Sequence, residues 1–432
     1  MKNTLTDLAI KAIKGAADEA GKDVYQLTRG DLLSHLESSG SQLTEWDFRK
    51  LGGFAAIRKA HFPEPFDTAA KRGVQIQRSY VNKLERNLGE WHYFLDAVTK
   101  KIGEILEEHP IQVAKVKPPE FKETQKDKLR EVVAFISDTH FGLTIDSEEV
   151  PTNAYSWEIA ARRMGKFAEQ VASYKIEHRA STPRLRLCLG GDLAQGIIHL
   201  DDAGTDLITN QVLGTVDILT KMIDYLRGYY KEIVVEAVPC NHLRLPHKSA
   251  GRATAQKWDA FSTMIHGMLQ AAYRNTSQVV FDVPKTPYAD FSVLGHRFYM
   301  THGDTTFEIG NPGSDISVKN ITNKVNTLNA AVKGKHYSVL MIGHVHTPLC
   351  ITLTRANGVE LVVNGTGSGA DPYSQSIGYE ASIAVQTIFE VTESYPIGDY
   401  RKIHLDDASF DKRYEKIIPP WNYGLVLDKK LK

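Results

Sequence analysis

Five short apolar runs, each closely followed by a polar motif, constrain the fold of this chain more than any other feature of its sequence. The runs are rich in β-branched and large apolar residues, which is typical of buried strands. Longer stretches with helical spacing, at 157–178 and 207–230, separate the first three runs. Strands that alternate with helices predict a layered α/β domain. The five strand-like runs are 132–137, 185–189, 233–238, 298–301 and 339–342.

The polar motifs at the ends of these runs carry side chains that bind metals. In open α/β sheets, sites form beyond the carboxyl ends of the strands, so residues far apart in the sequence converge there. Carboxylate and amide oxygens with imidazole nitrogens are typical donors to divalent metals. One such motif arises by chance, but five in order, each at a strand end, are hard to explain by core packing. The motif residues are Asp138, His140, Asp192, Asn241, His242, His302, His344 and His346.

The order of these motifs resembles that of the calcineurin-like metallophosphoesterase superfamily, whose pattern is D-x-H, G-D, G-N-H, H and G-H-x-H. The resemblance covers about residues 131–405 and implies a four-layer α/β/β/α sandwich. It implies that Asp192 bridges two metal ions and that His242 faces the scissile phosphate without binding metal. The remaining implied ligands are Asp138, His140 and His346 for one ion, and Asn241, His302 and His344 for the other.

The charges of such a site suit an anionic phosphoester. Two divalent ions carry four positive charges, of which Asp138 and Asp192 neutralise two. A water or hydroxide that bridges the ions is acidified and becomes the nucleophile at neutral pH. His242 then stabilises the transition state or protonates the leaving oxygen. The mixed donor set suits Mn, Fe or Zn. Nucleases of this superfamily usually work with Mn, so we expect Mn, with Fe, Zn and Mg as the other choices.

Some positions depart from the family pattern. Cys240 stands where the glycine before Asn-His is usual, and we do not expect it to act as a nucleophile. Leu243 replaces the acidic residue that several branches carry after that pair. The stretch 191–196 lacks the Asp-Arg-Gly of serine/threonine protein phosphatases, and the tyrosine ligand of purple acid phosphatases has no evident counterpart.

Basic and polar residues near the motifs are candidate substrate contacts, because Arg and Lys bind phosphate well and Arg does so with two parallel hydrogen bonds. The alternative is ordinary loop chemistry. The stretch 241–257 and the glycine-rich loop 364–373 resemble phosphoesterases that phages and prophages often encode. The candidate contacts are His199, Arg244, His247, Lys248, Lys257 and Tyr373.

The sequence before residue 131 divides into three parts. Residues 1–70 predict a small helical domain, either a helix-turn-helix unit that binds DNA or a helical adaptor. Residues 71–109 predict one long helix with a heptad seam, which packs on this chain's own domains or pairs two chains in a homodimer. Residues 110–130, rich in Lys and Pro, predict a linker. The seam residues are Val81, Leu84, Leu88, Trp91, Leu95, Val98, Ile102 and Ile105.

We therefore expect a catalytic domain at 131–406 and a C-terminal tail at 407–432 that wraps or dangles. The chain has 52 basic and 52 acidic residues, which excludes a strongly basic nucleic-acid coat but not a local basic groove. No stretch approaches the ~18 apolar residues of a membrane helix, and the first residues do not resemble a signal peptide. Three widely spaced cysteines favour a reducing cytoplasm, of a bacterium or a phage-infected host.

The sequence leaves three hypotheses for the function. The leading hypothesis is a DNA nuclease, exo- or endonucleolytic, similar to the SbcD-type branch of DNA repair nucleases; the capping domain of that branch is not recognisable here. The alternative is a phosphatase or phosphodiesterase that acts on nucleotides, cyclic nucleotides or nucleic-acid end phosphates. A DNA-binding or scaffolding protein with an idle site is the third, and the intact ligand set counts against it.

Overall fold

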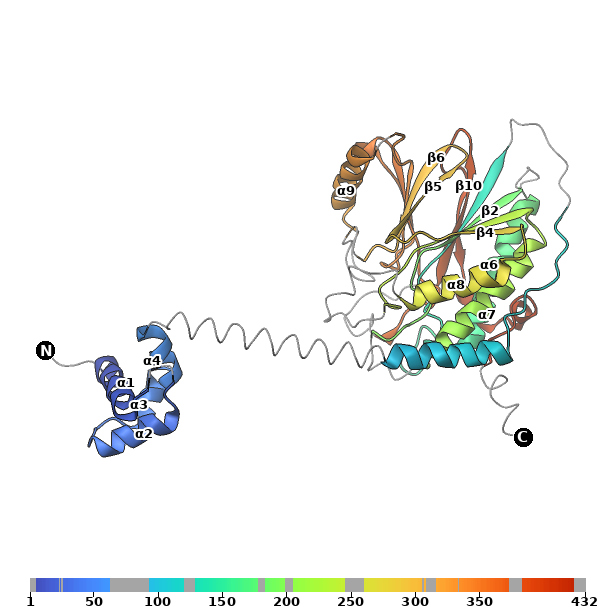
Figure 1. Ribbon diagram of the computed structural model, residues 1–432. Helices are drawn as coiled ribbons and strands as arrows, with labels where there is room; N and C mark the ends of the chain where they lie inside the picture. Colours follow the sequence, from blue (N-terminus) through green and yellow to red (C-terminus); the bar gives the residue numbers. More distant parts are fainter. Residues whose placement is uncertain are drawn as a thin grey trace, which may run out of the picture. The chain divides into compact units, whose positions relative to one another are not determined.

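The chain divides into two compact units, Met1–Tyr93 and Phe94–Lys432, each described here by itself (Figure 1). The computed structural model describes residues 5–22, 24, 26–62, 93–119, 129–177, 183–198, 205–244, 260–304, 307, 316–332, 334–372 and 383–422. Within these residues, no helix has both the length and the apolar character needed to cross a lipid bilayer.

Among its described residues up to 62, the first unit has four helices around a small apolar core. The main-chain amide of Thr28 donates to Asp31 at 2.7 Å, which forms the capping box that starts the second helix. Buried Ile13, Leu32 and Phe48 lie in the core that holds the helices together. Binding of DNA by this unit stays a prediction. The helices are α1 (Leu5–Ala20), α2 (Arg29–Ser38), α3 (Glu45–Lys50) and α4 (Phe54–His61).

The described part of the second unit contains two β-sheets. The first has six strands in the order β11-β10-β1-β2-β3-β4, and the second has five in the order β5-β6-β7-β9-β8. Neighbours from β1 to β4 are parallel, as are β6, β7 and β9. The strands are β1 (Arg130–Ile136), β2 (Arg184–Leu189), β3 (Glu232–Ala237), β4 (Val279–Asp282), β5 (Tyr288–Val293), β6 (His296–Thr301), β7 (Val339–Ile342), β8 (Leu349–Leu353), β9 (Val359–Val363), β10 (Val385–Thr392) and β11 (Tyr400–His404).

The alternation of side chains along β1 shows how the layers pack. Val133 and Phe135 face the second sheet, where they meet Phe298 of β6 in one apolar cluster. Ala134 and its neighbours on the opposite face pack against helices. Helices α6 (Trp157–Glu177), α7 (Ile208–Arg227) and α8 (Phe261–Tyr273) cover the first sheet, and α9 (Val318–Ala331) covers the second (Figure 1). The predicted mixed α/β class is confirmed.

The C-terminal part of the heptad seam packs on this chain's own domain. Residues 93–108 are helical, and the seam residues Val98, Ile102 and Ile105 are buried in the main core cluster. Leu95 is partly buried against the same cluster. The other seam residues, from Val81 to Trp91, lie outside the described residues, so a homodimer through this helix stays a prediction.

Residues 110–119 belong to the predicted linker, yet they dock on α7. The amide of Ala114 donates to Asp224 Oδ2 at 2.6 Å, and Arg227 donates to the Ala114 carbonyl at 3.0 Å. Ile111 and Val113 pack against the main core. Alternating apolar residues within a polar, proline-marked stretch explain why the segment is ordered along the domain.

The described part of the predicted tail wraps around α6. Two 3-10 turns, Asp406–Phe410 and Lys412–Lys416, lie against this helix. Tyr414 is buried, and Arg162 on α6 donates to Glu415 at 2.6 Å. Residues 423–432 lie outside the described residues.

Candidate functional site

The predicted site residues follow the carboxyl ends of strands from both sheets. β1 leads into Asp138, β2 into Asp192 and β3 into Asn241, all from the six-stranded sheet. β6 and β7 of the five-stranded sheet lead into His302 and His344. Because parallel strands present these ends along the same edge, the motifs converge.

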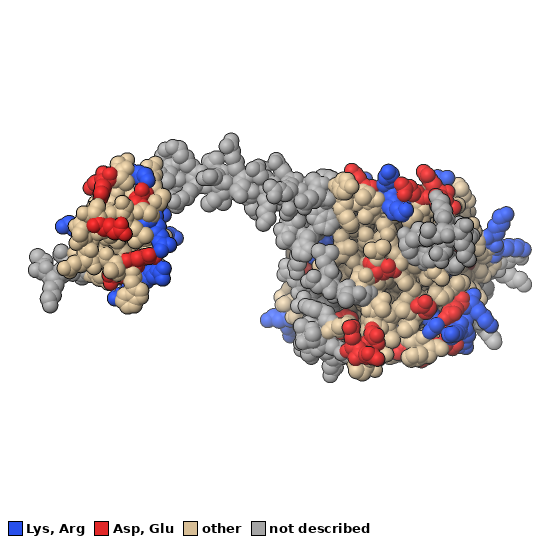
Figure 2. Space-filling view, turned by 90° about the horizontal axis from the view of Figure 1, so that it is seen from below, with Lys and Arg blue, Asp and Glu red and all other residues tan. Residues whose placement is uncertain are grey.

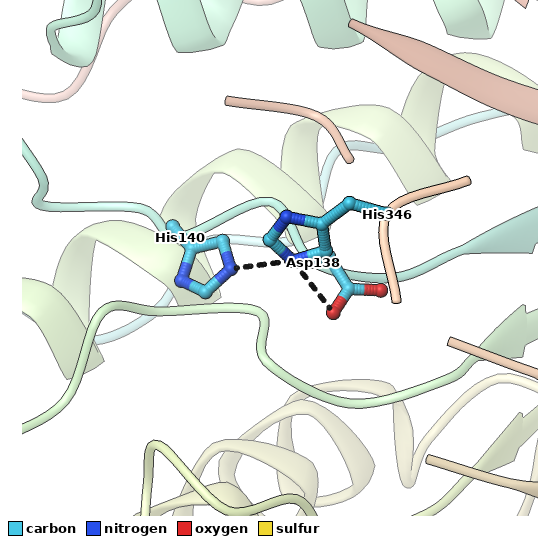
Figure 3. A group of neighbouring side chains, drawn as sticks. All are labelled: Asp138, His140 and His346. Atoms are coloured by element: carbon cyan, nitrogen blue, oxygen red, sulfur yellow. Dashed lines mark hydrogen bonds and ion pairs between the residues drawn. The ribbon is translucent and has the colours of Figure 1, made fainter. Parts of the chain in front are cut away.

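Asp138, His140 and His346 form the first ligand group, and their side chains point toward one another (Figure 3). One donor atom from each lies within 4.8 Å of the other two. His346 Nε2 lies 3.3 Å from Asp138 Oδ1 and 3.4 Å from His140 Nε2. All three residues are buried. The group therefore offers one carboxylate and two imidazoles to a single cation.

Asp192, His302 and His344 form the second ligand group, under the same 4.8 Å criterion. His302 Nε2 lies 2.8 Å from Asp192 Oδ2 and 2.8 Å from the side-chain oxygen of Asn241. Asn241 therefore joins this group. All seven residues expected to bind metal lie in these two groups.

Five of these residues hold unusual backbone conformations. A positive φ is rare for residues other than glycine and requires surrounding contacts that maintain it. Among the described non-glycine residues, only Leu294 and Asn357 share it outside the site. Such strain gathers at functional sites, so it supports a role for these turns. The five φ angles are 53° at Asp138, 48° at His140, 47° at Asp192, 70° at His344 and 59° at His346.

Two glycines of the motifs are explained by close approach. A Cβ on Gly343 would lie 2.7 Å from Asp138 Oδ2, and a Cβ on Gly196 would lie 1.9 Å from the His242 carbonyl oxygen. Gly196 also has a positive φ of 74°. A side chain at either position would displace the turn that carries a site residue.

Hydrogen bonds to carbonyl oxygens fix the orientation of three histidines. The Nδ1 of His140 donates to the side-chain oxygen of Gln195 at 2.8 Å, and that of His302 donates to the Gly190 carbonyl at 2.9 Å. The Nδ1 of His242 donates to the main-chain carbonyl of Gln195 at 2.8 Å. A proton on Nδ1 leaves the lone pair on Nε2, which is how metal-binding histidines are commonly held.

His346 presents its Nε2 to the first group. Its Nδ1 is buried and has no hydrogen-bond partner in the described part of the chain. Buried polar atoms without partners are rare in folded proteins. A cation in the first group would be bound by His346 Nε2, which lies 3.3 Å from Asp138 Oδ1 and 3.4 Å from His140 Nε2, and one carboxylate with two imidazoles suits a divalent cation.

The carboxylates of the site are ionised. Burial raises the pKa of Asp192, but the charges of His302 and His242 outweigh it and hold that pKa well below its usual value. Burial likewise raises the pKa of Asp138, but a hydrogen bond with His346 and the charges of nearby histidines keep it lowered.

The histidines divide into neutral and charged rings. Burial, with repulsion from His242 and His346, lowers the pKa of His140 to about 3. Burial, with repulsion from His302, lowers that of His344 to about 4. Burial also opposes the charge on His302, but attraction to Asp192 raises its pKa to about 9. Both neutral rings have lone pairs that a metal could use, whereas His302 would have to lose a proton before it could bind one.

His242 lies beside both groups without belonging to either. Its Nε2 is 3.8 Å from Asp192 Oδ2, and its ring centre is 4.7 Å from that of His140. That His242 is no ligand stays a prediction.

Arg244 is the one predicted substrate contact among the described residues. It is buried, and its Nε has no partner within the described part of the chain. Burial lowers its pKa, while the charges of Asp304 and Asp192 act in the opposite direction. Asp304, two residues after His302, is a site neighbour that sequence reasoning missed. The other predicted contacts, His199, His247, Lys248, Lys257 and Tyr373, lie outside the described residues.

The described part of the glycine-rich loop hydrogen-bonds to the main chain of Asp138. The hydroxyl of Thr366 and the amide of Gly367 donate to the Asp138 carbonyl at 2.9 and 2.8 Å. Buried Arg163 donates to the Gly367 carbonyl at 3.0 Å. Sequence reasoning missed Arg163 and Gln195; only Gln195 had a local signal, its place three residues after Asp192.

No protein-family model and no curated protein matches the chain. Among solved structures, it is similar to a metallophosphoesterase from Sphaerobacter thermophilus, with 13% identity, a TM-score of 0.27, and coverage of 69% of this chain and 97% of that one. It is also similar to phosphopantetheinyl hydrolase from Mycobacterium tuberculosis, with 12% identity, a TM-score of 0.24, and coverage of 60% and 96%. We base the function on the site residues themselves.

Proposed function

We propose that this chain is a dinuclear-metal phosphoesterase that hydrolyses phosphodiester bonds and acts on DNA as a nuclease. The observation that carries the proposal is the pair of adjacent ligand groups, which bring one carboxylate each together with imidazoles and an amide. The two stacked sheets with helices on both outer faces suit the four-layer sandwich of the calcineurin-like metallophosphoesterases.

In this proposal, Asp138, His140 and His346 would hold one divalent ion, and Asn241, His302 and His344 would hold the other. Asp192 would be shared by both, which is supported by its contacts with a residue of each group: its Oδ2 lies 2.8 Å from His302 Nε2, and its carbonyl accepts from the His140 amide at 3.1 Å. Bound ions would supply Lewis acidity and lower the pKa of an attacking water. The mixed oxygen and nitrogen donors suit Mn, with Fe, Zn or Mg as alternatives.

In this proposal, His242 transfers a proton and Arg244 binds the substrate phosphate. The Gln195 carbonyl holds His242 by its Nδ1, so Nε2 faces the site; a ring that also carries a proton on Nε2 can pass it to the leaving oxygen. The guanidinium of Arg244 lies near Asp192, and its Nε has no partner among the described residues, so it is free to bind a phosphoryl oxygen of the substrate.

The separate helical unit supports a polymeric substrate. Binding of DNA needs many phosphate contacts, which a second domain can add to those near the metals. We propose that residues 1–62 make such contacts, as expected for a nuclease of the SbcD type.

One observation favours the second candidate, a phosphatase or phosphodiesterase for small substrates. On the face shown in Figure 2, basic and acidic side chains of the larger unit are interspersed rather than sorted by sign. The whole chain also has a net charge of zero. A compact substrate would need only the site itself.

Cleavage of end-labelled single- and double-stranded DNA with Mn, beside a small chromogenic phosphodiester, separates the two candidates. Asp192→Asn serves as the blank, and Asp407→Asn on the exposed C-terminal segment is the matched control. DNA cleavage that disappears only in Asp192→Asn establishes a nuclease. Hydrolysis of the small ester alone would replace it with the small-substrate enzyme, and equal activity in both variants would overturn the site.

A further inference from the structure

Each ligand group takes its side chains from both sheets. Asp138 and His140 follow β1 of the six-stranded sheet, whereas His346 follows β7 of the five-stranded sheet. In the second group, Asp192 follows β2, and His302 follows β6. The spacing between the sheets therefore decides whether the donor atoms of either group converge.

A buried glutamine on β10 hydrogen-bonds to the main chain of the residue that precedes Asp138. The side-chain oxygen of Gln386 accepts from the amide of Ser137 at 2.9 Å, and its nitrogen donates to the Ser137 carbonyl at 3.0 Å. Ser137 immediately precedes Asp138. Gln386 is fully buried, so no water competes for these hydrogen bonds.

A buried asparagine from the other sheet meets this glutamine. Asn364 follows β9, and its side-chain nitrogen donates to the side-chain oxygen of Gln386 at 2.8 Å and to the Phe135 carbonyl at 3.1 Å. Its main-chain amide donates at 2.8 Å to the carbonyl of Ile342, two residues before His344. Thr387 donates to the Asn364 side-chain oxygen at 3.0 Å. We call Asn364 and Gln386 the amide clasp.

We propose that the amide clasp is a positioning device that sets the spacing of the two sheets, so that both ligand groups are assembled before metal binds. The proposal rests on the dinuclear function proposed above. The sheets have little slack at this point, since a Cβ on Gly343 would lie 3.0 Å from Ser137 Oγ and 2.7 Å from Asp138 Oδ2. Removal of a group that supports a metal ligand in this way commonly weakens metal binding by about 10–100-fold.

The experiment compares Gln386→Met with a matched control, Gln278→Met. Gln278 is also a buried amide; it donates to the carbonyls of Arg227 and Tyr230 at 2.7 and 2.8 Å. It precedes β4, so it lies at the opposite end of the strands from the ligand groups. For the wild-type protein and both variants, we would measure Mn affinity and stoichiometry by calorimetry, Mn–Mn coupling by electron paramagnetic resonance, and the thermal unfolding midpoint.

Both variants are expected to unfold at lower temperature, because each loses buried hydrogen bonds. Only Gln386→Met is expected to bind Mn about 10–100-fold more weakly and to change the Mn–Mn coupling. Mn binding that is equal in the two variants would overturn the clasp. If Gln386→Met does not fold, Thr387→Val, which removes one bond to the clasp, tests the same point with a smaller expected loss of affinity, and unchanged affinity there would overturn the clasp as well. A wild-type protein that binds fewer than two Mn would instead overturn the dinuclear function.

Discussion

The main-chain amide of His344 donates to both carboxylate oxygens of Asp138, at 3.0 and 3.1 Å. The two residues belong to different sheets and stand 206 positions apart in the sequence. The carboxylate of Asp138 belongs to the first group, while the ring of His344 belongs to the second. This contact therefore joins the two groups and stabilises the ionised form of a buried carboxylate.

Replacement of His242 separates catalysis from metal binding. His242→Ala should retain both metals, because the ring belongs to neither ligand group. Turnover should fall by roughly 10²–10⁴-fold, the usual contribution of a general acid or base. Metal analysis and steady-state rates on the same preparation check this. Loss of a metal ion from the variant would make His242 a ligand and contradict the assignment.

Gln195 offers a second test, because its side chain supports a ligand while its main chain supports His242. Gln195→Met removes the acceptor for His140 Nδ1 at similar length, and Gln195→Glu retains one. Mn affinity should fall by about 10-fold or more in Gln195→Met and remain close to the wild-type value in Gln195→Glu. Mn titration of both variants measures this. Equal affinity in the two would show that the hydrogen bond does not matter.

The convergence of the two candidate ligand groups was predictable because each residue follows an apolar run and carries a donor side chain. Their supporting residues were not. Gln386 lies inside the apolar run 384–389, and nothing in the local sequence shows that it reaches the main chain of β1. Arg163 sits among the ordinary charges of α6, although it is buried beneath the loop at Gly367. Such contacts depend on which elements become neighbours, and local pattern does not encode that.

The heptad seam is a second case in which local sequence does not tell which elements become neighbours. Its spacing predicts an apolar face on a helix, and Val98, Ile102 and Ile105 do form one. Spacing does not identify what covers the face, which is the chain's own core in this case. The fold class, by contrast, follows from alternating strand and helix patterns that each element carries by itself.

Glu236 gives the stability of the larger unit a pH dependence. Burial raises the pKa of Glu236 from 4.5 to about 7, and the charge of Asp282 adds to the rise. Arg186 acts in the opposite direction, with a guanidinium nitrogen 2.7 Å from Glu236 Oε1. Between these values the folded state keeps a proton that the unfolded state has lost, so stability falls as pH rises from 4.5 to 7. The shift corresponds to at most about 3 kcal/mol.

Glu236→Gln removes this titration while keeping the shape of the side chain. The unfolding free energy of the variant minus that of the wild-type protein should be larger at pH 8 than at pH 5, by up to about 3 kcal/mol. Urea unfolding of both proteins at the two pH values measures the difference, and the other titrating groups cancel in the comparison. The same difference at both pH values would show that Glu236 does not titrate in this window.

Two truncations test where the larger unit begins. Removal of residues 1–92 leaves the helix 93–108 in place, whereas removal of 1–110 also deletes Val98, Ile102 and Ile105 from the core. Burial of each such side chain contributes roughly 1.5–3 kcal/mol, so the shorter protein should unfold at a markedly lower temperature. The longer protein should keep its two metals and its hydrolysis of a small phosphodiester, because every described ligand lies after residue 137. Thermal unfolding and metal analysis of both truncations check these points. Equal unfolding temperatures would mean that the seam residues contribute nothing to the core, and the seam would again be free to pair two chains.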